Sequence, residues 1–317
     1  MSQERELLRE TVRELVAKHA GPAAVRDAME SERGYDESLW KLLCDQVGAA
    51  ALVVPEEFGG AGGELADAAT VLQELARGLV PTPLLGTTLA ELALLAADDV
   101  DAEALARLAE GTAIGAVVFD PDYVVNGDIA DVVVAVEHGR LIRWSAFNSR
   151  RVDTMDRTRR LAAVTPSDTT DVGDDPGIAD TAAILLAAEQ IGAAERCLEL
   201  TVEYTKSRVQ FGRPIGSFQA LKHRMADLYV AVSAARAVVD EAIGEPSSTM
   251  AALARVSATD AFNAVAADAI QMHGGIAITW EHDIQLYFKR AHGSAELLGP
   301  PREHLRRLEQ EVLNSKA

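Results

Sequence analysis

The sequence predicts a mainly α-helical protein, with a reduced β domain between an N-terminal helical domain and a C-terminal four-helix bundle. Apolar residues recur at helical spacing over residues 1–112 and again over 178–317. Residues 113–177 instead hold short β-like runs broken by turn-forming residues. Aromatic residues make up only 5% of the chain, a composition that favours close-packed helices over an aromatic-lined sheet. We therefore expect three domains with boundaries near residues 112 and 177.

The N-terminal domain is predicted to be a set of helices interrupted by one glycine-rich loop. Two apolar stripes indicate the first helices: Leu7, Val12, Leu15 and Val16, then Leu39, Trp40, Leu42, Leu43 and Val47. The loop VPEEFGGAGGELADA places four glycines between Phe58 and Glu64 and ends the helical pattern. A further helix is expected through Leu72, Leu75 and Leu79.

The middle domain is predicted to contain about four short strands. The runs AIGAVVF, DVVVAVE, RLIRWSAF and LAAVTP have the composition of strands and are separated by Gly, Asp and Asn. The segment PSDTTDVGDDPG, which ends at Gly177, is polar and rich in Asp and Gly, so we expect a linker there. This is too little chain for a complete β-barrel.

The C-terminal domain is predicted to be a bundle of four long antiparallel helices. The first should cover 178–207 and the second should begin near Ser217. The third is expected over about 250–272 and the fourth from near Pro301. Long apolar stripes joined by short connections are typical of a bundle.

The charge and composition restrict the possible partners and location. The formal net charge is −19, and an acidic surface repels nucleic-acid backbones and anionic membranes, so neither is an expected partner. A phosphate-containing ligand must then be held by a few local cations. Cys44 and Cys197 lie far apart, which argues against a disulfide framework or a zinc site, and no metal site is expected. The N-terminal stretch lacks the apolar region of a signal peptide, so the sequence indicates a cytoplasmic protein.

Two motifs in the last third of the chain suggest nucleotide chemistry. RVQFGRPIGSFQALKHRMADL, residues 208–228, joins two predicted helices through a turn rich in glycine and proline. QMHGGIAITWEHDIQLYFKRA, residues 271–291, contains a glycine pair that lets another group approach the backbone. Taken alone, the first is equally a capped interhelical loop and the second a helix stop.

Together the two motifs resemble the signature of the flavin-dependent acyl-CoA dehydrogenase family, and residues 39–78 resemble its helical first domain. The resemblance covers residues 1–95 and 178–317. It implies that FAD is the cofactor and that the Arg208 guanidinium clamps its pyrophosphate, which suits a planar fork facing phosphate oxygens. It further implies contacts near the cofactor from Phe211, Phe218, Gln219, Gln271, His273, Gly274 and Gly275. The third glycine of the family's run is Ala277 here.

Two features of the family are missing. Its middle domain carries a T-E-P-x-x-G-S-D loop around the flavin ring, and the nearest stretch here, FDPDYVVNGD, does not match. The family also needs a carboxylate to remove the α-proton of the thioester while FAD takes the β-hydrogen as hydride. The two positions that the family uses for this base hold Leu298 and Ala182.

Other carboxylates are poor substitutes for this base. Glu296 and Asp180 lie two residues from the two base positions, and two residues rotate a side chain by about 200° around a helix. The cluster Glu281, His282 and Asp283 is better explained by helix capping or an intersubunit salt bridge.

The retained and missing features together suggest a subunit that works with a partner. In the family's dimers, the arginine and Gly-Gly motifs of one subunit hold the ADP end of FAD that is bound mainly by the neighbour. The resemblance is therefore to the short subunit of heterotetrameric (α2β2) acyl-CoA dehydrogenases of actinobacterial steroid degradation. A homologous partner would supply the base and most of the acyl-CoA site. A self-sufficient homo-oligomer with a relocated base and a non-catalytic helical scaffold remain alternatives.

Overall fold

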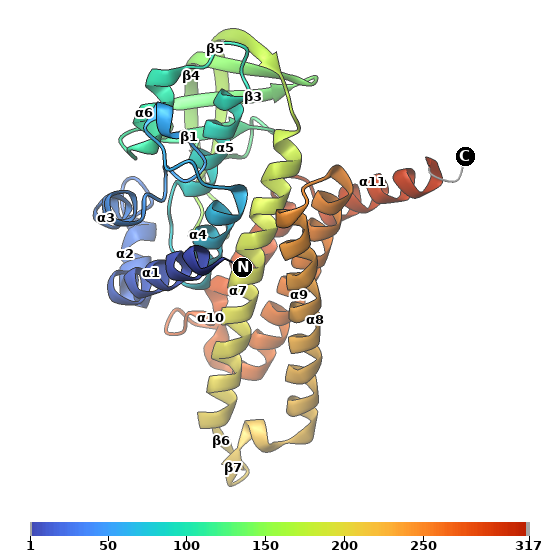
Figure 1. Cartoon of the computed structure of the whole chain (residues 1–317). Coiled ribbons are helices and arrows are strands. Elements are labelled where there is room, and N and C mark those ends of the chain that lie inside the picture. Colours follow the sequence, from blue (N-terminus) through green and yellow to red (C-terminus); the bar gives the residue numbers. More distant parts are fainter. Residues whose placement is uncertain (1, 315–317) are drawn as a thin grey trace.

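The computed structural model describes residues 2–314 and places three groups of elements along the chain (Figure 1). The first four N-terminal helices lie to one side, the last two lie with the strands at the top, and the long C-terminal helices run downward. The N-terminal helices are α1 (Gln3–His19), α2 (Pro22–Glu30), α3 (Glu37–Val47), α4 (Leu65–Arg77), α5 (Leu84–Leu95) and α6 (Ala102–Ala109), with a 3-10 turn η1 (Glu56–Phe58). The predicted fold class, mainly helical with a small sheet and a C-terminal bundle, is confirmed.

Local sequence signals fix the starts of the first helices. The Ser2 hydroxyl accepts a hydrogen bond from the Arg5 N–H at 3.2 Å and caps α1. The predicted apolar stripe of α1 is wrong at Leu7, which is largely exposed, whereas Leu8 packs against the core.

In the glycine-rich loop that precedes α4, a Cβ at Gly60 would lie 1.9 Å from the Val54 carbonyl oxygen. This loop therefore requires glycine for packing within the domain.

The strands form a five-stranded sheet in the described residues, with the order β1-β3-β4-β5-β2. Strand β1 runs parallel to β3, and the other pairs are antiparallel. The strands are β1 (Gly115–Val118), β2 (Val124–Val125), β3 (Val132–Glu137), β4 (Arg140–Val152) and β5 (Leu161–Asp174). Two-residue β2, which the sequence did not predict, pairs with the start of β5.

The predicted linker is wrong over 166–174, because this segment is the second half of β5. It pairs with β4 in a long ribbon, with Asp168 opposite Ala146 and Thr170 opposite Arg143. Most of these residues are exposed, so the ribbon carries no apolar alternation that would mark a strand. Across the ribbon, Arg140 binds Asp171 at 2.7 Å and also pairs with Asp174, so the acidic residues that suggested a linker serve as cross-strand partners.

The bundle consists of α7 (Ile178–Ser207), α8 (Gln219–Gly244), α9 (Ser248–His273) and α10 (Ile284–Glu296). The fourth helix was predicted to begin near Pro301, and this is wrong. A helix does begin there, α11 (Pro301–Asn314), but it packs on α9 and extends away from the other helices (Figure 1). The short apolar set of α10, Ile284, Leu286, Tyr287 and Ala291, fills the fourth place instead. None of the helices within residues 2–314 is long and apolar enough to cross a membrane.

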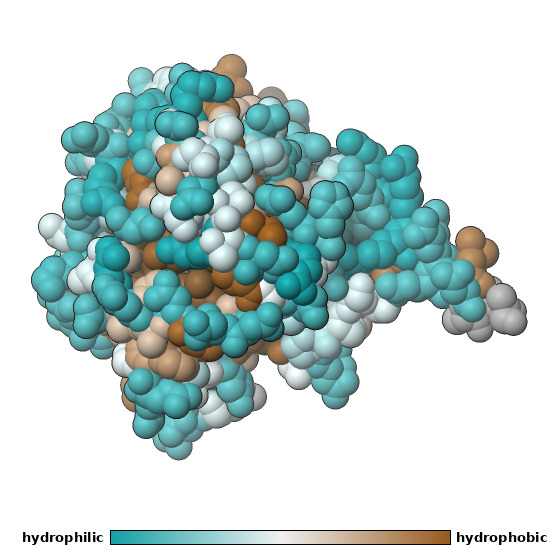
Figure 2. Space-filling model, turned by 90° about the horizontal axis from the view of Figure 1, so that it is seen from above, coloured by the Kyte–Doolittle hydropathy of each residue, from teal (hydrophilic) through white to brown (hydrophobic). Residues whose placement is uncertain are grey.

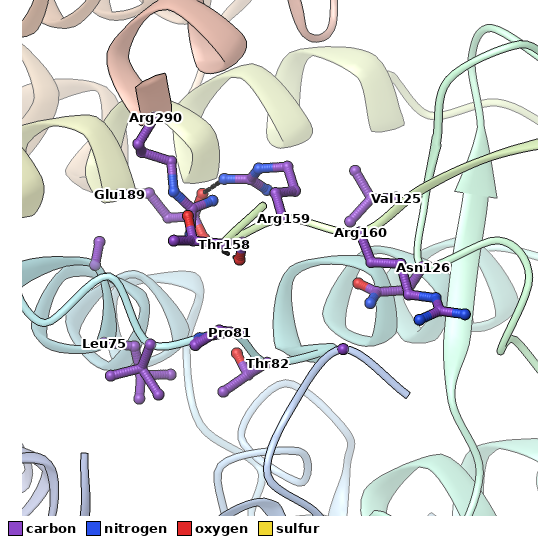
Figure 3. A pocket seen from close by; sticks show the side chains of 13 residues that line it. Leu75, Pro81, Thr82, Val125, Asn126, Thr158, Arg159, Arg160, Glu189 and Arg290 are labelled. Carbon is purple, nitrogen blue, oxygen red and sulfur yellow. Dashed lines mark hydrogen bonds and ion pairs between the residues drawn. The ribbon is translucent and has the colours of Figure 1, made fainter. Parts of the chain in front are cut away.

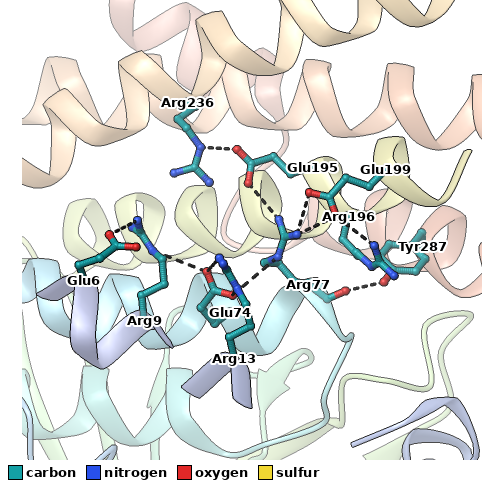
Figure 4. Close-up of polar contacts among 10 residues, drawn as sticks. All are labelled: Glu6, Arg9, Arg13, Glu74, Arg77, Glu195, Arg196, Glu199, Arg236 and Tyr287. Carbon is teal, nitrogen blue, oxygen red and sulfur yellow. Dashed lines mark hydrogen bonds and ion pairs between the residues drawn. The ribbon is translucent and has the colours of Figure 1, made fainter. Parts of the chain in front are cut away.

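The N-terminal helices pack directly on the bundle. Helices α4 and α7 approach so closely that a Cβ at Gly192 would lie 2.2 Å from the Gln73 carbonyl oxygen. Beside this contact, the buried Glu74 carboxylate accepts hydrogen bonds from Arg13 at 2.9 and 3.0 Å (Figure 4). Arg77 then binds Glu199 at 2.7 Å, so an ion network connects α1 and α4 to α7.

Glu91 of α5 is a fully buried carboxyl group. Both of its oxygens lack a hydrogen bond among the described residues, and burial raises the pKa of Glu91 well above its ordinary value. A raised folded-state pKa means that the unfolded chain releases its proton first as the pH rises. Stability therefore falls from about pH 4, the unfolded pKa, up to the folded pKa.

We expect Glu91→Leu to raise the free energy of unfolding at pH 8 by about 1–3 kcal/mol, because it removes an unsatisfied buried polar group. The gain should shrink toward pH 5, where the unfolded chain also begins to bind the proton. Urea unfolding at pH 5, 6.5 and 8 measures this. Glu10→Leu, at an exposed position of α1, is the matched control and should show no such trend. A gain that is equal at all three pH values would mean that Glu91 does not titrate between the folded and unfolded states.

Candidate cofactor and acyl site

The first predicted motif forms an exposed tip at the lower end of the bundle (Figure 1). Arg208 is the C-terminal cap residue of α7, and its N–H donates to the Tyr204 carbonyl at 2.9 Å. Arg196, more than three turns earlier on α7, pairs with Glu199, whereas the Arg208 side chain is exposed and forms no ion pair within residues 2–314. Its guanidinium group is thus available to an external anion.

A short hairpin follows Arg208 and gathers aromatic and cationic groups. Strands β6 (Val209–Gln210) and β7 (Arg213–Pro214) are joined by a turn in which Phe211 has φ +51° and is 91% exposed. The rings of Phe211 and Phe218 meet edge to face with centroids 6.1 Å apart, and the Arg213 guanidinium lies 4.0 Å from the Phe218 centroid. After the 3-10 turn η2 (Ile215–Ser217), Gln219 begins α8 and is also exposed. The structure therefore brings Phe211, Phe218 and Gln219 together beyond the end of α7.

The second motif ends α9 at the same end of the bundle. Gly274 has φ +66°, which favours glycine, and a Cβ at Gly274 or Gly275 would meet no atom within 4 Å. The backbone of the pair is therefore open to a close approach, and Gln271 beside it is exposed. The 3-10 helix η3 (Gly274–Ile278) follows, with Ala277 buried at the third position of the glycine run.

His273 is buried behind this surface rather than presented on it. Its Nδ1 donates to the Ala269 carbonyl at 2.8 Å, while Nε2 has no partner among the described residues. Burial lowers the pKa of His273. Its predicted role toward the cofactor stays a prediction.

Tyr204 connects the two motifs and was not recognised from the sequence. It lies one turn before Arg208 on α7, its ring stacks on His273 with centroids 4.2 Å apart, and its hydroxyl donates to the His273 carbonyl at 3.3 Å. The ends of α7 and α9 are thereby held together. The sequence signal that could have identified Tyr204 was its position four residues before Arg208, which places both on one face of a helix.

A large cavity of about 870 Å³ lies at the other end of the bundle, between α5, the sheet and the α10–α11 turn. Its lining includes Phe119, Asp120 and Tyr123, from the stretch that fails to match the flavin-ring loop. It also includes Leu298, the residue at the predicted base position. The structure thus brings these two segments together around one space.

The turn that carries Leu298 is held by a buried arginine that the sequence analysis missed. Arg255 of α9 donates to the Leu297 carbonyl at 2.6 Å and also to the Ser294 carbonyl, at the C-terminal end of α10. It further binds the Gln190 side chain at 2.8 Å. No carboxylate pairs with it in the described part of the chain, and burial lowers the pKa of Arg255 to about 10. A cation is favourable at a helix C-terminus. Because Arg255 holds the carbonyl groups of Ser294 and Leu297, it also positions the backbone of the next residue, Leu298, whose φ is +59°.

Similarity to known proteins agrees with the motifs and the fold. A family model described as the acyl-CoA dehydrogenase C-terminal domain matches residues 179–313, and one for the N-terminal domain matches residues 2–112. The acyl-CoA dehydrogenase IpdE2 of Mycobacterium tuberculosis is 72% identical over 313 residues, covering 99% of this chain and 98% of that protein. The chain belongs to the acyl-CoA dehydrogenase family. IpdE2 of Mycolicibacterium smegmatis is 70% identical and covers 98% of this chain and 100% of that protein.

Solved acyl-CoA dehydrogenase structures share the whole fold. The steroid acyl-CoA dehydrogenase Tcur3481–Tcur3483, a G363A variant, matches with a TM-score of 0.90 and 26% identity, covering 99% of each chain. The ChsE4–ChsE5 complex from Mycobacterium tuberculosis matches with a TM-score of 0.88 and 24% identity, covering 99% of this chain and 98% of the other. The second comparison shows the fold alone.

Neither residue at the two predicted base positions can accept a proton. Ala182 is fully buried in α7, and Leu298 offers only hydrocarbon to the cavity. Asp180 forms an ion pair with Arg307 at 2.7 Å, whereas Glu296 is exposed and lines the cavity. Glu296 is thus the candidate relocated carboxylate that the geometry brings near the cavity.

His304 of α11 is a further titratable group at this turn that the sequence analysis missed. Its Nε2 lies 3.2 Å from the Leu298 carbonyl oxygen, and because a carbonyl only accepts, Nε2 carries the hydrogen and Nδ1 is left as an acceptor. Burial lowers the pKa of His304. The signal available in the sequence was its position one turn into the helix that follows Pro301.

The polar cluster at residues 281–283 has a structural explanation in this acyl-CoA dehydrogenase. The cluster Glu281–Asp283 lies at the start of α10, where His282 Nδ1 accepts the Ile284 N–H at 3.1 Å and Asp283 binds Arg26 at 2.6 Å.

A small pocket beside Arg159, which pairs with Glu189, measures about 20 Å³ and has room for about one water molecule (Figure 3). Within residues 2–314, no group of three or more His, Cys, Asp or Glu side chains is placed to hold a metal ion.

Proposed function

We propose that this chain is one subunit of a heteromeric, flavin-dependent acyl-CoA dehydrogenase that introduces an α,β double bond into a CoA thioester. One observation carries the proposal: the Arg208 side chain is exposed, while Leu298, at the predicted base position, lines a cavity. The partner, a homologous subunit in a heterotetramer, supplies the base and most of the acyl-CoA site.

The residues at the lower end of the bundle fit the ADP end of FAD. Arg208 is a cation without an ion-pair partner in the described part of the chain, and the Gly274–Gly275 backbone has open space in front of it. Arg208 would hold the pyrophosphate, with Phe211, Phe218 and Gln219 beside it and the Gln271–Gly275 segment facing the ADP portion. When bound, FAD supplies the hydride acceptor for the oxidation.

Exposed apolar side chains around the same motifs support a partner at this end. Phe211 on the hairpin and Ile278 and Trp280 after η3 are large hydrophobic residues in contact with solvent, with Ile278 78% exposed. Large exposed hydrophobic side chains grouped in this way are typical of a surface that another subunit covers. A cofactor held here would then lie between two chains.

The proposed substrate is a steroid-derived CoA thioester. Support comes from the similarity to the steroid acyl-CoA dehydrogenase Tcur3481–Tcur3483, at a TM-score of 0.90. That enzyme and the ChsE4–ChsE5 complex each combine two different proteins, which supports a heteromeric assembly here.

Flavin stoichiometry tests the proposal. Expressed alone, the chain should be colourless or poorly soluble, because it lacks the flavin-ring loop. Co-expressed with a neighbouring acyl-CoA dehydrogenase gene product, it should co-purify and give about one FAD per heterodimer. Visible absorbance at known protein concentration and analytical ultracentrifugation measure both. A yellow, fully loaded homo-oligomer that oxidises an acyl-CoA would overturn the heteromer.

That outcome would favour the second candidate, a self-sufficient homo-oligomer with a relocated base. The observation in its favour is that Glu296 lines the 870 Å³ cavity next to Leu298. A chain that never binds flavin, with or without a partner, would instead indicate a non-catalytic scaffold.

A further inference from the structure

The cavity at the α10–α11 turn has no use in the proposed function, since the reacting site lies in the partner. Its volume of about 870 Å³ is toward the upper end of the range for sites that bury a small molecule. Most of its wall comes from four segments: α5, the strands β1 and β2 with their connection, the 154–161 loop, and the α10–α11 turn. Ala179, at the start of α7, also lines it. A single alkyl chain would leave much of this volume unfilled, so the space suits a bulkier, fused-ring molecule.

The walls are largely apolar. Hydrocarbon side chains come from every segment around the space: Leu85, Leu89, Val117, Phe119, Val125, Met155, Leu161, Leu297 and Leu298. Figure 2, viewed toward the sheet end, shows apolar residues near the middle of this face with hydrophilic residues around them. Apolar surface of this extent, enclosed by helices and strands, favours a hydrocarbon-rich ligand.

The charges around the cavity exclude an anionic ligand. The lining holds four carboxylates, Asp120, Asp156, Glu296 and Glu303, but only two guanidinium groups, Arg159 and Arg307. Both guanidinium groups are already engaged, Arg307 with Asp180 at 2.7 Å and Arg159 with Glu189. A phosphate or carboxylate would therefore meet net negative charge and no free cation in the lining.

We propose that this cavity is a ligand site of the chain itself, which binds an uncharged, fused-ring hydrocarbon molecule and does not oxidise it. Leu298 gives the site its unreactive character, because hydrocarbon stands where the family's base would contact the bound acyl group. The site thus acts as a binding or effector site, separate from the reacting centre of the assembly. The proposal does not depend on whether FAD binds at Arg208.

A neutral steroid ketone with a photoreactive diazirine tests this site, applied to the co-purified heteromer. Irradiation should label peptides of this chain that contain residues 119–125 or 297–300, as mass spectrometry will show. Ala179 lines the cavity as the second residue of α7, so Ala179→Trp should fill the space and reduce this labelling by about tenfold or more. Ala23→Trp, also at an exposed second position of a helix, is the matched control and should leave the labelling unchanged.

Three further readouts keep the proposal falsifiable. The carboxylate analogue of the same steroid should label the cavity peptides several-fold less than the ketone. Flavin content and turnover should be the same in Ala179→Trp and Ala23→Trp, because the reacting site is elsewhere. Labelling that ignores Ala179→Trp, labelling found only in the partner, or flavin lost from the Ala179→Trp complex would each overturn the proposal. The last result would mean that the cavity is a flavin-ring site.

Discussion

Glutamine in place of Glu296 should leave reduction of the bound flavin within a few-fold of the unaltered complex. Glu296 is the last residue of α10 and is exposed at the rim of the cavity, whereas Leu298, at the predicted base position, lies beyond the helix end with φ +59°. The helical rotation of about 200° expected from the sequence therefore does not describe this turn, but the two side chains still start from backbone of different conformation. Glu296 therefore lacks the placement needed to take a proton from a bound thioester. Bleaching of the flavin absorbance on addition of acyl-CoA measures this half-reaction without the natural electron acceptor.

The glutamate of the partner at the matching position should behave very differently. Its replacement by glutamine should slow bleaching by about 10²- to 10⁴-fold, the usual effect of removing a general base. Asp180→Asn in this chain is a second control, and any loss there should follow from the broken ion pair with Arg307. If Glu296→Gln abolished bleaching while flavin content and assembly stayed intact, this chain would carry its own base and the self-sufficient enzyme would be preferred.

Arg208→Ala should weaken FAD retention in the complex by roughly thirtyfold, equivalent to about 2 kcal/mol. The reason is the loss of a charge-assisted contact to phosphate by a cation that has no carboxylate partner within residues 2–314. Flavin remaining after extensive dialysis, and the dissociation constant from titration of the apo complex, measure the effect.

Two further variants serve as controls for this measurement of FAD affinity. Arg208→Lys should restore part of the affinity, since it keeps the charge but loses the forked geometry. Lys206→Ala removes an exposed cation two residues away on α7 and should change the affinity little. Unchanged flavin content in Arg208→Ala would mean that Arg208 serves only as the end of a helix.

The sequence predicted those parts of the fold whose apolar pattern is regular. Both ends of the helix over 178–207 were predicted, because its apolar face is continuous. The domain boundaries themselves stay predictions. The second half of strand β5 was missed because the outer half of the β4–β5 ribbon is exposed and shows no alternation. Helix α10 was missed as the fourth bundle helix because its short apolar face lies within a motif assigned to cofactor binding.

The candidate site was predictable only where residues adjacent in sequence act together. Arg208, Phe211, Phe218 and Gln219 lie in one string, and the structure gathers them at one tip. The roles of Tyr204 and Arg255 depend on contacts to residues about 70 and 40 positions away, respectively. The cavity likewise exists only once the sheet and the α10–α11 turn meet.

The contact between Arg255 and the end of α10 has a consequence for how this subunit could have diverged. The carbonyl groups before Leu298 are held from α9, so the shape of the turn does not depend on the side chain at position 298. Loss of a reactive carboxylate there needs only the exchange of one side chain, with no remodelling of the loop. Chemistry at this position can thus be gained or given up by a single substitution while the surrounding scaffold is kept.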